Sequence, residues 1–467
     1  MNTGPARGMR DFLPDDVRRR RHVIGVIADV YQRYGFEPLE TPSVENLATL
    51  QGKYGEEGDR LIFKILKRGE GAETGQADLA LRYDLTVPLA RVVAEYRAKL
   101  PKFFKRYQVQ PVWRADRPQK GRFREFYQCD VDAIGSTSMV VEAELLAAAS
   151  DVFSRLGFSD FVIRLNHRKL LEALLAGRQI SKSSWADFLS AADDLDKIDV
   201  NDAVARLMEK GHDADGAASW INWLAQFKWR RGDARPLSAF NEGLDKFETL
   251  FNTADQGHPQ LAAREAAQAA IVELKQLLAL SESTSARGRI VFDFSLARGL
   301  SYYTGAIFEI AVPDLAGSMG GGGRYDNLIG MFSGEDVPAC GISLGLERIL
   351  VVMGERNMFP PSLVASAADV MVVQWFAAKT ELYLALATEL RAAGLRVELY
   401  PEAPAEDNQK GAIVKQFQYA QARGIPFAAV IGKPELEAGT VTIRTLATRQ
   451  DEQRPRADVA AYIKTKI

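Results

Sequence analysis

Apolar positions in the first third of the chain follow two spacings. Some segments repeat apolar residues every three or four positions, which predicts helices, and others alternate apolar with polar residues, which predicts strands. On this basis we expect helices at 15–34 and 85–98, and strands at 61–66, 79–82, 106–114 and 123–133. Residues 115–122 join the last two strands and contain Pro118 and Gly121, so we expect a long antiparallel hairpin.

A long segment in the middle of the chain loses the strand pattern. Residues 168–285 are rich in Ala, Leu, Glu, Asp and Lys at helical spacing, so we expect a mostly helical insertion. Before it we expect a helix at 140–156 and a strand at 160–166. After it we expect strands at 289–295, 302–312 and 339–345, a glycine run (Gly317, then Gly320 to Gly323) leading into a helix, and a last helix from Leu346.

The final part of the chain alternates strands with helices, which predicts a compact α/β domain. The expected strands are 369–374, 395–400, 426–432 and 440–446, and the expected helices are 377–393, 409–423 and 457–466. Pro360 and Pro361 are adjacent, which favours a linker before this domain. The predicted division is therefore 1–167 and 286–354 as two parts of one domain, 168–285 as the insertion, 355–366 as the linker and 367–467 as the C-terminal domain.

Composition narrows the classes of protein. The chain has 467 residues, 47% of them hydrophobic, and a formal charge of −2, which excludes a mainly disordered chain and a polycation. Two cysteines, Cys129 and Cys340, cannot build a disulfide framework, and we expect reduced, packed thiols. The four histidines show no zinc-binding spacing. The sequence shows no signal peptide and no apolar run of roughly 18 residues, so we expect a cytoplasmic protein without membrane association.

Positive charge concentrates around the predicted hairpin. Between Lys99 and Arg124 there are nine Lys or Arg residues and a single acid, Asp116, which gives 9 − 1 = +8 in a chain that is negative overall. Nucleic acid, if it binds, must therefore bind through local patches such as this one.

Several side chains near the hairpin suit a binding pocket, although each has a simpler explanation. Arg114 could bind a phosphate through two parallel hydrogen bonds, or it could be a surface arginine. Phe126 could stack on an adenine or belong to the core. Gln128, Asp130 and Asp132 alternate and so share one face of a strand, which is either a wet pocket or an exposed sheet face.

The later motifs are ambiguous in the same way. Arg298 precedes Tyr302 and Tyr303, and because neighbouring strand residues point to opposite sides, at most one of these tyrosines should face a given pocket. The run GGGGRYD at 320–326 lets backbone approach a ligand, but it is not a Walker loop and could be a plain turn. Arg348 stands in the first turn of a helix, where a surface role is also possible.

The order of these motifs is more specific than any one of them. GMRDFLP (8–14), RYDLTVPLAR (82–91), the basic hairpin, RGLSYYTG, GGGRYD and GISLGLERI occur in this order in one chain. The combination resembles the histidyl-tRNA synthetase family of class II aminoacyl-tRNA synthetases over most of the chain, except the insertion, which varies in that family. The resemblance implies an α+β fold, in which an antiparallel sheet flanked by helices carries a helical insertion and a C-terminal α/β anticodon-binding domain.

The activity implied is that of a histidine–tRNA ligase. It activates L-histidine with ATP to histidyl-adenylate and pyrophosphate, then transfers histidine to the 3′-terminal ribose of tRNA(His). Mg²⁺ is expected with ATP, whereas no metal-binding side chains are assigned. A homodimer is expected, with Pro42 at its interface. A polar pocket discriminates against apolar isosteres by about four to five decades in kcat/KM. No editing domain is therefore expected.

The resemblance also assigns site residues. The catalytic set is Arg114, Arg298 and Arg348, and the ATP-binding set is Arg114, Phe126 and Arg348. The histidine-binding set is Asp84, Leu85, Thr86, Gln128, Asp132, Arg298, Tyr302 and Tyr303. One position departs from the family pattern, because Ser301 stands where an acid is usual, which removes a charge near Arg298.

Three other functions fit part of the pattern. A regulatory paralogue, like the regulatory subunit of ATP phosphoribosyltransferase, generally lacks the anticodon domain and loses catalytic arginines. A plain RNA-binding module would use the basic hairpin but leaves the histidine-pocket residues unexplained. A sister enzyme for another amino acid is disfavoured by Asp132, Tyr303 and the RGLSYYTG signature.

Overall fold

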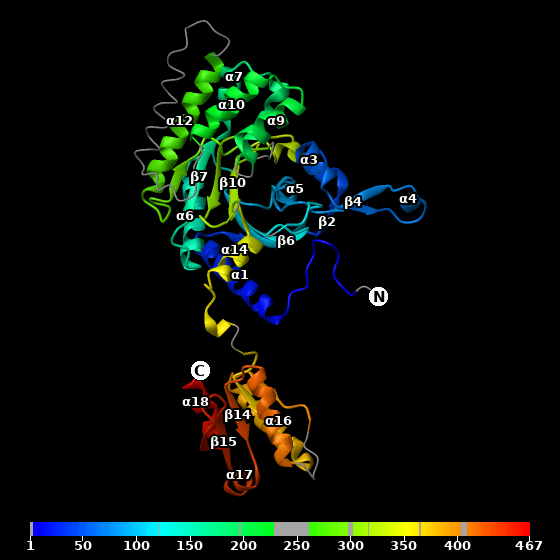
Figure 1. Ribbon diagram of the computed structural model, residues 1–467, viewed down its shortest axis with the longest axis vertical. Coiled ribbons are helices and arrows are strands. Elements are labelled where there is room, and N and C mark those ends of the chain that lie inside the picture. Colours follow the sequence, from blue (N-terminus) through cyan, green and yellow to red (C-terminus); the bar gives the residue numbers. More distant parts are fainter. Residues whose placement is uncertain are drawn as a thin grey trace. The chain divides into compact units, whose positions relative to one another are not determined.

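The computed structural model describes residues 3–119, 121–195, 198–227, 261–297, 302–315, 317–363, 366–402 and 409–467. It contains two compact units (Figure 1). The first comprises Met1–Leu13 and Arg20–Met358, and the second comprises Pro14–Arg19 and Phe359–Ile467. Within the described ranges, no helix combines the length and apolar character needed to cross a bilayer.

An eight-stranded sheet forms the centre of the first unit (Figure 1), in the order β1-β5-β6-β11-β10-β9-β7-β8. The strands are β1 (Glu37–Pro38), β5 (Phe104–Trp113), β6 (Glu125–Ile134), β7 (Val162–His167), β8 (Ile290–Phe292), β9 (Ala306–Ala311), β10 (Gly320–Arg324) and β11 (Ala339–Gly345). The pairs from β5 to β7 are antiparallel, and the two outer pairs are parallel. The predicted antiparallel sheet and its long hairpin are therefore confirmed.

The glycine run forms strand β10, which the sequence did not predict, and a short helix (Gly330–Ser333) follows it as expected. A Cβ atom on Gly322 would lie 1.8 Å from the carbonyl oxygen of Gly341, and one on Gly323 would lie 2.5 Å from that of Ala306. The neighbouring strands thus approach too closely for any side chain. Because glycine carries no side chain to alternate, the strand had no periodic signal in the sequence.

Helices cover the central sheet of the first unit. They include α1 (Pro14–Arg33), α5 (Thr86–Tyr96), α6 (Val140–Arg155), α13 (Gly330–Ser333) and α14 (Leu346–Glu355). Val23, Ile27 and Val30 on α1 are buried, as the helical spacing predicted. Cys129 on β6 and Cys340 on β11 are free and buried, which confirms the expected packed thiols.

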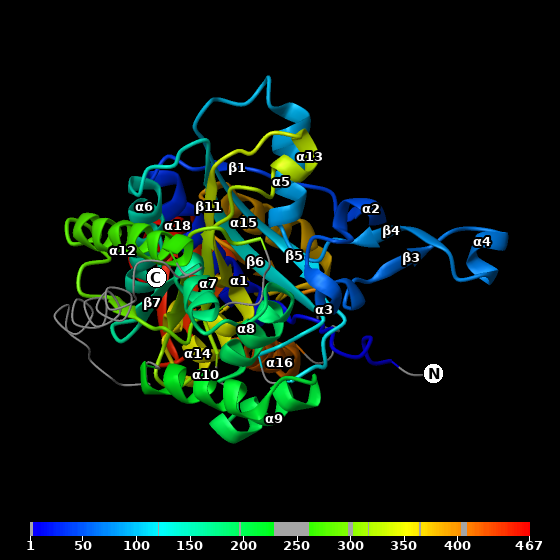
Figure 2. The ribbon, with the colours of Figure 1, turned by 90° about the horizontal axis from the view of Figure 1, so that it is seen from above.

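A smaller three-stranded sheet, ordered β2-β4-β3, extends away from the central sheet (Figure 2). Its strands and adjoining helices are β2 (Val44–Asn46), α2 (Leu47–Leu50), α3 (Gly55–Arg60), β3 (Lys64–Leu66), α4 (Glu70–Glu73) and β4 (Ala77–Leu81). Val44, Leu66 and Leu79 on its strands are exposed apolar side chains.

Between residues 168 and 285, every regular element that the structure describes is a helix. These helices are α7 (Arg168–Gly177), η1 (Lys182–Ser184), α8 (Trp185–Asp194), α9 (Val200–Glu209), α10 (Ala214–Phe227) and α12 (Leu261–Ser281). Residues 228–260 lie outside the described ranges.

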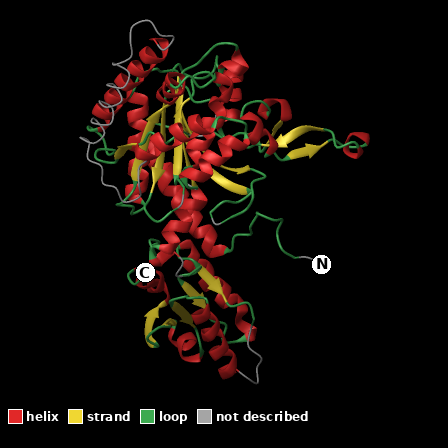
Figure 3. Cartoon of the chain, turned by 45° about the horizontal axis from the view of Figure 1, so that its top comes forward, coloured by secondary structure: helices red, strands yellow, loops and turns green. Residues whose placement is uncertain are grey.

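The second unit is an α/β domain (Figure 3) with strand order β13-β12-β14-β15-β16. Its strands are β12 (Val370–Val372), β13 (Val397–Leu399), β14 (Phe427–Val430), β15 (Thr440–Thr445) and β16 (Gln450–Pro455). Its helices are η2 (Pro361–Leu363), η3 (Ala377–Lys379), α15 (Thr380–Ala392), α16 (Gln409–Ala422), α17 (Lys433–Ala438), η4 (Arg456–Asp458) and α18 (Val459–Lys464). The sequence missed α17 and β16, because α17 is short and β16 (QDEQRP) is an edge strand without apolar alternation.

Candidate active site

The antiparallel pairing of β6 with β5 and β11 creates a polar strip in the middle of the sheet. Gln128, Asp130 and Asp132 share one face of β6, as their spacing predicted. They lie opposite Gly345, Ser343 and Gly341 of β11. The small partners leave room above the sheet, where the polar side chains line a cavity of about 360 Å³.

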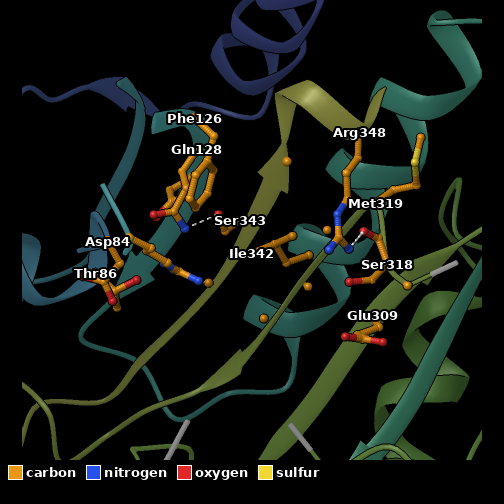
Figure 4. Close-up of a pocket in the computed structure, with 18 of the residues that line it drawn as sticks. Asp84, Thr86, Phe126, Gln128, Glu309, Ser318, Met319, Ile342, Ser343 and Arg348 are labelled. Carbon is orange, nitrogen blue, oxygen red and sulfur yellow. Dashed lines mark hydrogen bonds between the residues drawn. The ribbon is translucent and has the colours of Figure 1, made fainter. Parts of the chain in front are cut away.

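The cavity brings together most of the residues predicted for one site (Figure 4). Those lining it are Asp84, Thr86, Arg114, Phe126, Gln128, Asp132, Tyr302, Tyr303 and Arg348. Leu85 is not a lining residue, because its side chain is fully buried in the core. Arg298 and Ser301 lie outside the described residues.

Arg114 is held at the end of the first hairpin strand. Its backbone N–H donates to the carbonyl of Arg124, 2.9 Å away, and its Nε donates to the carbonyl of Tyr83 at 3.0 Å. Its guanidinium lies 4.3 Å from the Tyr83 ring centroid and 5.3 Å from that of Phe126. The arginine is thus oriented before any ligand binds and lies beside an aromatic face.

Arg348 reaches the cavity from the first turn of α14. Its Nη1 donates to the carbonyl of Ser318 at 2.5 Å (Figure 4). The preceding residue, Glu347, is buried and accepts hydrogen bonds from Arg20 Nη1 at 2.9 Å and from the Tyr127 backbone N–H at 3.0 Å. These contacts fix the start of α14 against β6, so that Arg348 and the hairpin are positioned together.

Asp132 is tied to two buried partners. Arg106 lies 2.8 Å from its Oδ2, and the Tyr325 hydroxyl donates to its Oδ1. Sequence reasoning missed both partners: Arg106 was counted only as one of nine basic residues, and GGGGRYD was valued for its glycines. The signal for Arg106 was the hairpin register, which places it directly opposite Asp132.

The two tyrosines correct a prediction. Tyr302 and Tyr303 both line the cavity, with ring centroids 5.0 Å apart. The rule that neighbouring residues face opposite sides does not apply, because β9 begins only at Ala306 and the tyrosines precede it. Tyr302 also lies edge-on to Tyr325, at 5.9 Å between centroids.

Three carboxylates in the cavity wall are buried, and burial raises the pKa of each. Desolvation is the largest cause for Asp84, Asp130 and Asp132. It raises the pKa of Asp130 to about 7, although Arg106 lowers it. Asp84 Oδ1 accepts from the Tyr54 hydroxyl at 3.0 Å and from the Val87 N–H at 3.1 Å, which favours its charged form.

The structure reduces the basic surface that the sequence suggested. Arg106 is fully buried, Lys105 lies 3.0 Å from Glu144, and Arg122 lies 2.8 Å from Asp116. Lys120 lies outside the described residues. Arg117 remains exposed at the hairpin tip. A count of +8 therefore overstates the positive charge that this stretch presents to solvent.

The chain was also compared with known proteins. A family model described as histidyl-tRNA synthetase matches residues 8–349, and one described as an anticodon-binding domain matches residues 369–466. Histidine–tRNA ligases from Gloeobacter violaceus and Porphyromonas gingivalis are 40% and 41% identical, over 99% and 98% of each chain respectively. The crystal structure of histidyl-tRNA synthetase from Nostoc sp. PCC 7120 covers 100% of both chains, with 30% identity and a TM-score of 0.77.

Proposed function

This chain belongs to the histidyl-tRNA synthetase family, and from that premise we propose how its cavity performs the reaction. The protein is an aminoacyl-tRNA ligase that charges tRNA(His) with histidine, using ATP. The observation that carries the proposal is the convergence on one cavity of Arg114, Phe126 and Arg348 with the polar strip of β6.

We assign the first step to Arg114, Phe126 and Arg348, which line the cavity together. The histidine carboxylate attacks the α-phosphorus of ATP, a bond forms between them, and the bond to the leaving pyrophosphate breaks. Negative charge grows on the phosphoryl oxygens, where a pre-oriented Arg114 stabilises it without reorganisation. Phe126 stacks on the adenine, and Arg348 holds the far side of the nucleotide. Arg298 belongs to this set by resemblance alone.

We assign histidine recognition to the polar strip of β6 and the side chains beside it. Asp84, Thr86 and Gln128 bind the α-amino group, while Asp132, Tyr302 and Tyr303 surround the imidazole. The buried position of Asp132 supports this role, because a buried polar group left without its ligand is costly. Selectivity then follows from hydrogen bonds that an apolar analogue cannot make. We assign Leu85 a role in core packing rather than a direct contact, because its side chain is fully buried and does not line the cavity.

Mg²⁺ is proposed to arrive with ATP, since its charge compensates the departing pyrophosphate. Among the described residues, no group of three or more His, Cys, Asp or Glu side chains is arranged to hold a metal ion. The proposed ion is therefore bound mainly through the nucleotide phosphates. What this chain itself supplies near the phosphates is guanidinium charge.

The second step transfers histidine from the adenylate to the terminal ribose of tRNA(His). We propose that the hairpin tip contacts the acceptor end of the tRNA. The match of residues 369–466 to an anticodon-binding domain supports anticodon contact by the second unit. The proposed domains are accordingly a catalytic domain at 1–167 and 286–354, an insertion at 168–285, a linker at 355–366 and an anticodon-binding domain at 367–467.

A homodimer is proposed from the surface of the three-stranded sheet. Pro42 is exposed beside it, and Val44, Leu66 and Leu79 expose apolar side chains on its strands. Exposed apolar groups gathered on one small sheet favour an interface. Sedimentation at several concentrations tests this state, and a species that stays monomeric throughout would contradict it.

Histidine-dependent exchange of pyrophosphate into ATP tests the activation step. We expect exchange with L-histidine and none with the other amino acids. A folded protein that shows no exchange with any amino acid would overturn the proposal and favour the regulatory paralogue. Exchange with a different amino acid would instead identify a sister enzyme.

A further inference from the structure

Asp130 stands in the middle of the polar strip, between Gln128 and Asp132, yet neither the recognition of histidine nor the activation step uses it so far. Its side chain lines the cavity and is only 2% exposed. Within the described part of the chain, its Oδ1 is fully buried and has no hydrogen-bond partner. A buried carboxylate oxygen without a donor is costly, which points to a ligand that supplies one.

Most of the described donors around Asp130 bond to other groups. On β5, Arg106 Nη1 donates to Gln108 at 3.1 Å and Nη2 pairs with Asp132, while its buried Nε has no hydrogen-bond partner in the described ranges. Gln108 donates to Thr41 and Gln110. On β11, the Ser343 hydroxyl accepts from Gln128 at 2.8 Å and lowers the pKa of Asp130 by hydrogen bonding. The described neighbours thus leave Oδ1 of this cavity-lining residue without a hydrogen bond.

Gln128, beside Asp130, also has a buried acceptor oxygen without a hydrogen bond from any described group. Its Nε2 donates to Ser343, but its Oε1 is buried and lacks a donor among the described residues. Two neighbouring acceptors on one strand face, Gln128 Oε1 and Asp130 Oδ1, therefore await N–H groups. An ammonium offers three N–H donors from a single atom, whereas an imidazole ring offers one per nitrogen.

Charge points the same way. Asp84, Asp130 and Asp132 are all buried, and the guanidinium of Arg106, also buried, is already paired with Asp132. The three acids still outnumber the two described guanidinium groups near them, Arg106 and Arg114, which both lower the pKa of Asp84. A cationic ligand group would compensate the remaining negative charge, a neutral ring would not, and a carboxylate would be repelled.

Resting on the proposed function, we propose that Asp130 is a substrate-binding residue that accepts a charged hydrogen bond from the α-ammonium group of histidine, beside Gln128. The ammonium then donates hydrogen bonds to both Gln128 Oε1 and Asp130 Oδ1. It lies on the polar strip of β6, next to the imidazole site at Asp132. The histidine carboxylate is left to point toward Arg114.

The test is direct binding of two ligands to the full chain by calorimetry. L-Histidine carries the ammonium, and imidazolepropionate is the same molecule without it. We expect Asp130→Asn to weaken histidine binding by about tenfold to a hundredfold, the effect of losing one charged hydrogen bond. Imidazolepropionate binding should change little, because it never made that contact.

A matched control separates this contact from loss of a carboxylate in general. Asp151 on α6 lies outside the cavity and accepts from the Tyr34 hydroxyl at 2.5 Å. Asp151→Asn should leave the affinity for both ligands unchanged. Asp130→Ser, a smaller neutral side chain, should reproduce the selective loss if the asparagine amide itself disturbs the cavity.

Two results would overturn the proposal. Unchanged histidine affinity in both Asp130 variants would show that Asp130 does not contact the substrate. An equal loss for histidine and imidazolepropionate would place its effect on the ring or on the fold. Because binding is measured without turnover, a wild-type protein that binds histidine but shows no pyrophosphate exchange would refute the proposed function while leaving the role of Asp130 intact.

Discussion

The acids and the arginines that line the cavity differ in burial as well as in charge. Asp84, Asp130 and Asp132 are buried. Arg114 and Arg348 are only half-buried. Buried acids suit recognition of a small amine, since each unmatched buried group is costly. Half-exposed arginines suit a large polyanion, whose remaining charge can stay in water.

The same strand explains why these environments lie so close together. β6 (Glu125–Ile134) carries Phe126 near its start and continues through Gln128 to the buried acids. Arg114 follows the end of the partner strand β5 and is half-buried, whereas Asp130 and Asp132 lie between β5 and β11. The reacting carboxylate and phosphate are therefore expected where the two environments meet.

The largest expected effect follows from removing Arg106, the buried counter-charge of the acids in the cavity wall. Arg106→Ala should lower the free energy of unfolding by about 3–5 kcal/mol, because it leaves Asp132 buried and unpaired. Denaturant unfolding measures this loss. Arg33→Ala removes an exposed arginine 2.9 Å from Asp29 and should cost no more than about 1 kcal/mol. Similar losses in both variants would remove the contrast between buried and exposed charge.

Loss of a half-buried cavity arginine should change the rate of the reaction rather than the stability of the fold. Arg114→Ala should slow histidine-dependent pyrophosphate exchange by about two to three decades, or roughly 3–4 kcal/mol of transition-state stabilisation. Its thermal unfolding should change little, because the side chain is half-buried. Arg33→Ala again serves as the control and should exchange at the wild-type rate. Normal exchange by Arg114→Ala would exclude this arginine from the reaction.

The pH dependence of stability sharpens the comparison further. Burial raises the pKa of Asp130 to about 7, so the folded protein holds this proton more tightly than the unfolded chain. That stabilisation is complete below the unfolded pKa near ~4 and is lost as the pH rises through about 7. Asp130→Asn lacks this dependence, so without ligand it should match the wild type at low pH and exceed it by about 1–3 kcal/mol at pH ~8.

Thermal unfolding of both proteins across that range measures the difference. A variant that loses stability equally at every pH would contradict the burial of a titrating carboxylate. The expected gain also illustrates a cost of function, because the group proposed to bind substrate destabilises the free protein.

The smallest effect is expected at the exposed tip. Arg117→Ala should leave pyrophosphate exchange unchanged and weaken tRNA charging modestly, because one exposed phosphate contact is partly screened by salt. Aminoacylation measured at two salt concentrations tests this, and the gap between variant and wild type should narrow at high salt. A large loss of exchange would show that the tip also acts in activation.

Strong periodicity made part of this structure predictable. The helix at the N-terminus, the long hairpin and the shared face of Gln128, Asp130 and Asp132 follow from local spacing alone. Strand β10 did not, because glycine has no side chain to alternate and its extended form depends on the backbones on either side. The same limit applies to Tyr302 and Tyr303, whose direction is set by a turn rather than by a strand.

The sequence by itself determined the family, the order of the motifs and which residue types could meet nucleotide and histidine. Tertiary structure alone decided how they are paired. It buried Arg106 against Asp132, turned both tyrosines into the cavity and left Oδ1 of Asp130 without a hydrogen bond from any described residue. Motif order is a local property of the chain, whereas desolvation and hydrogen-bond partners depend on strand register and on residues far away in sequence.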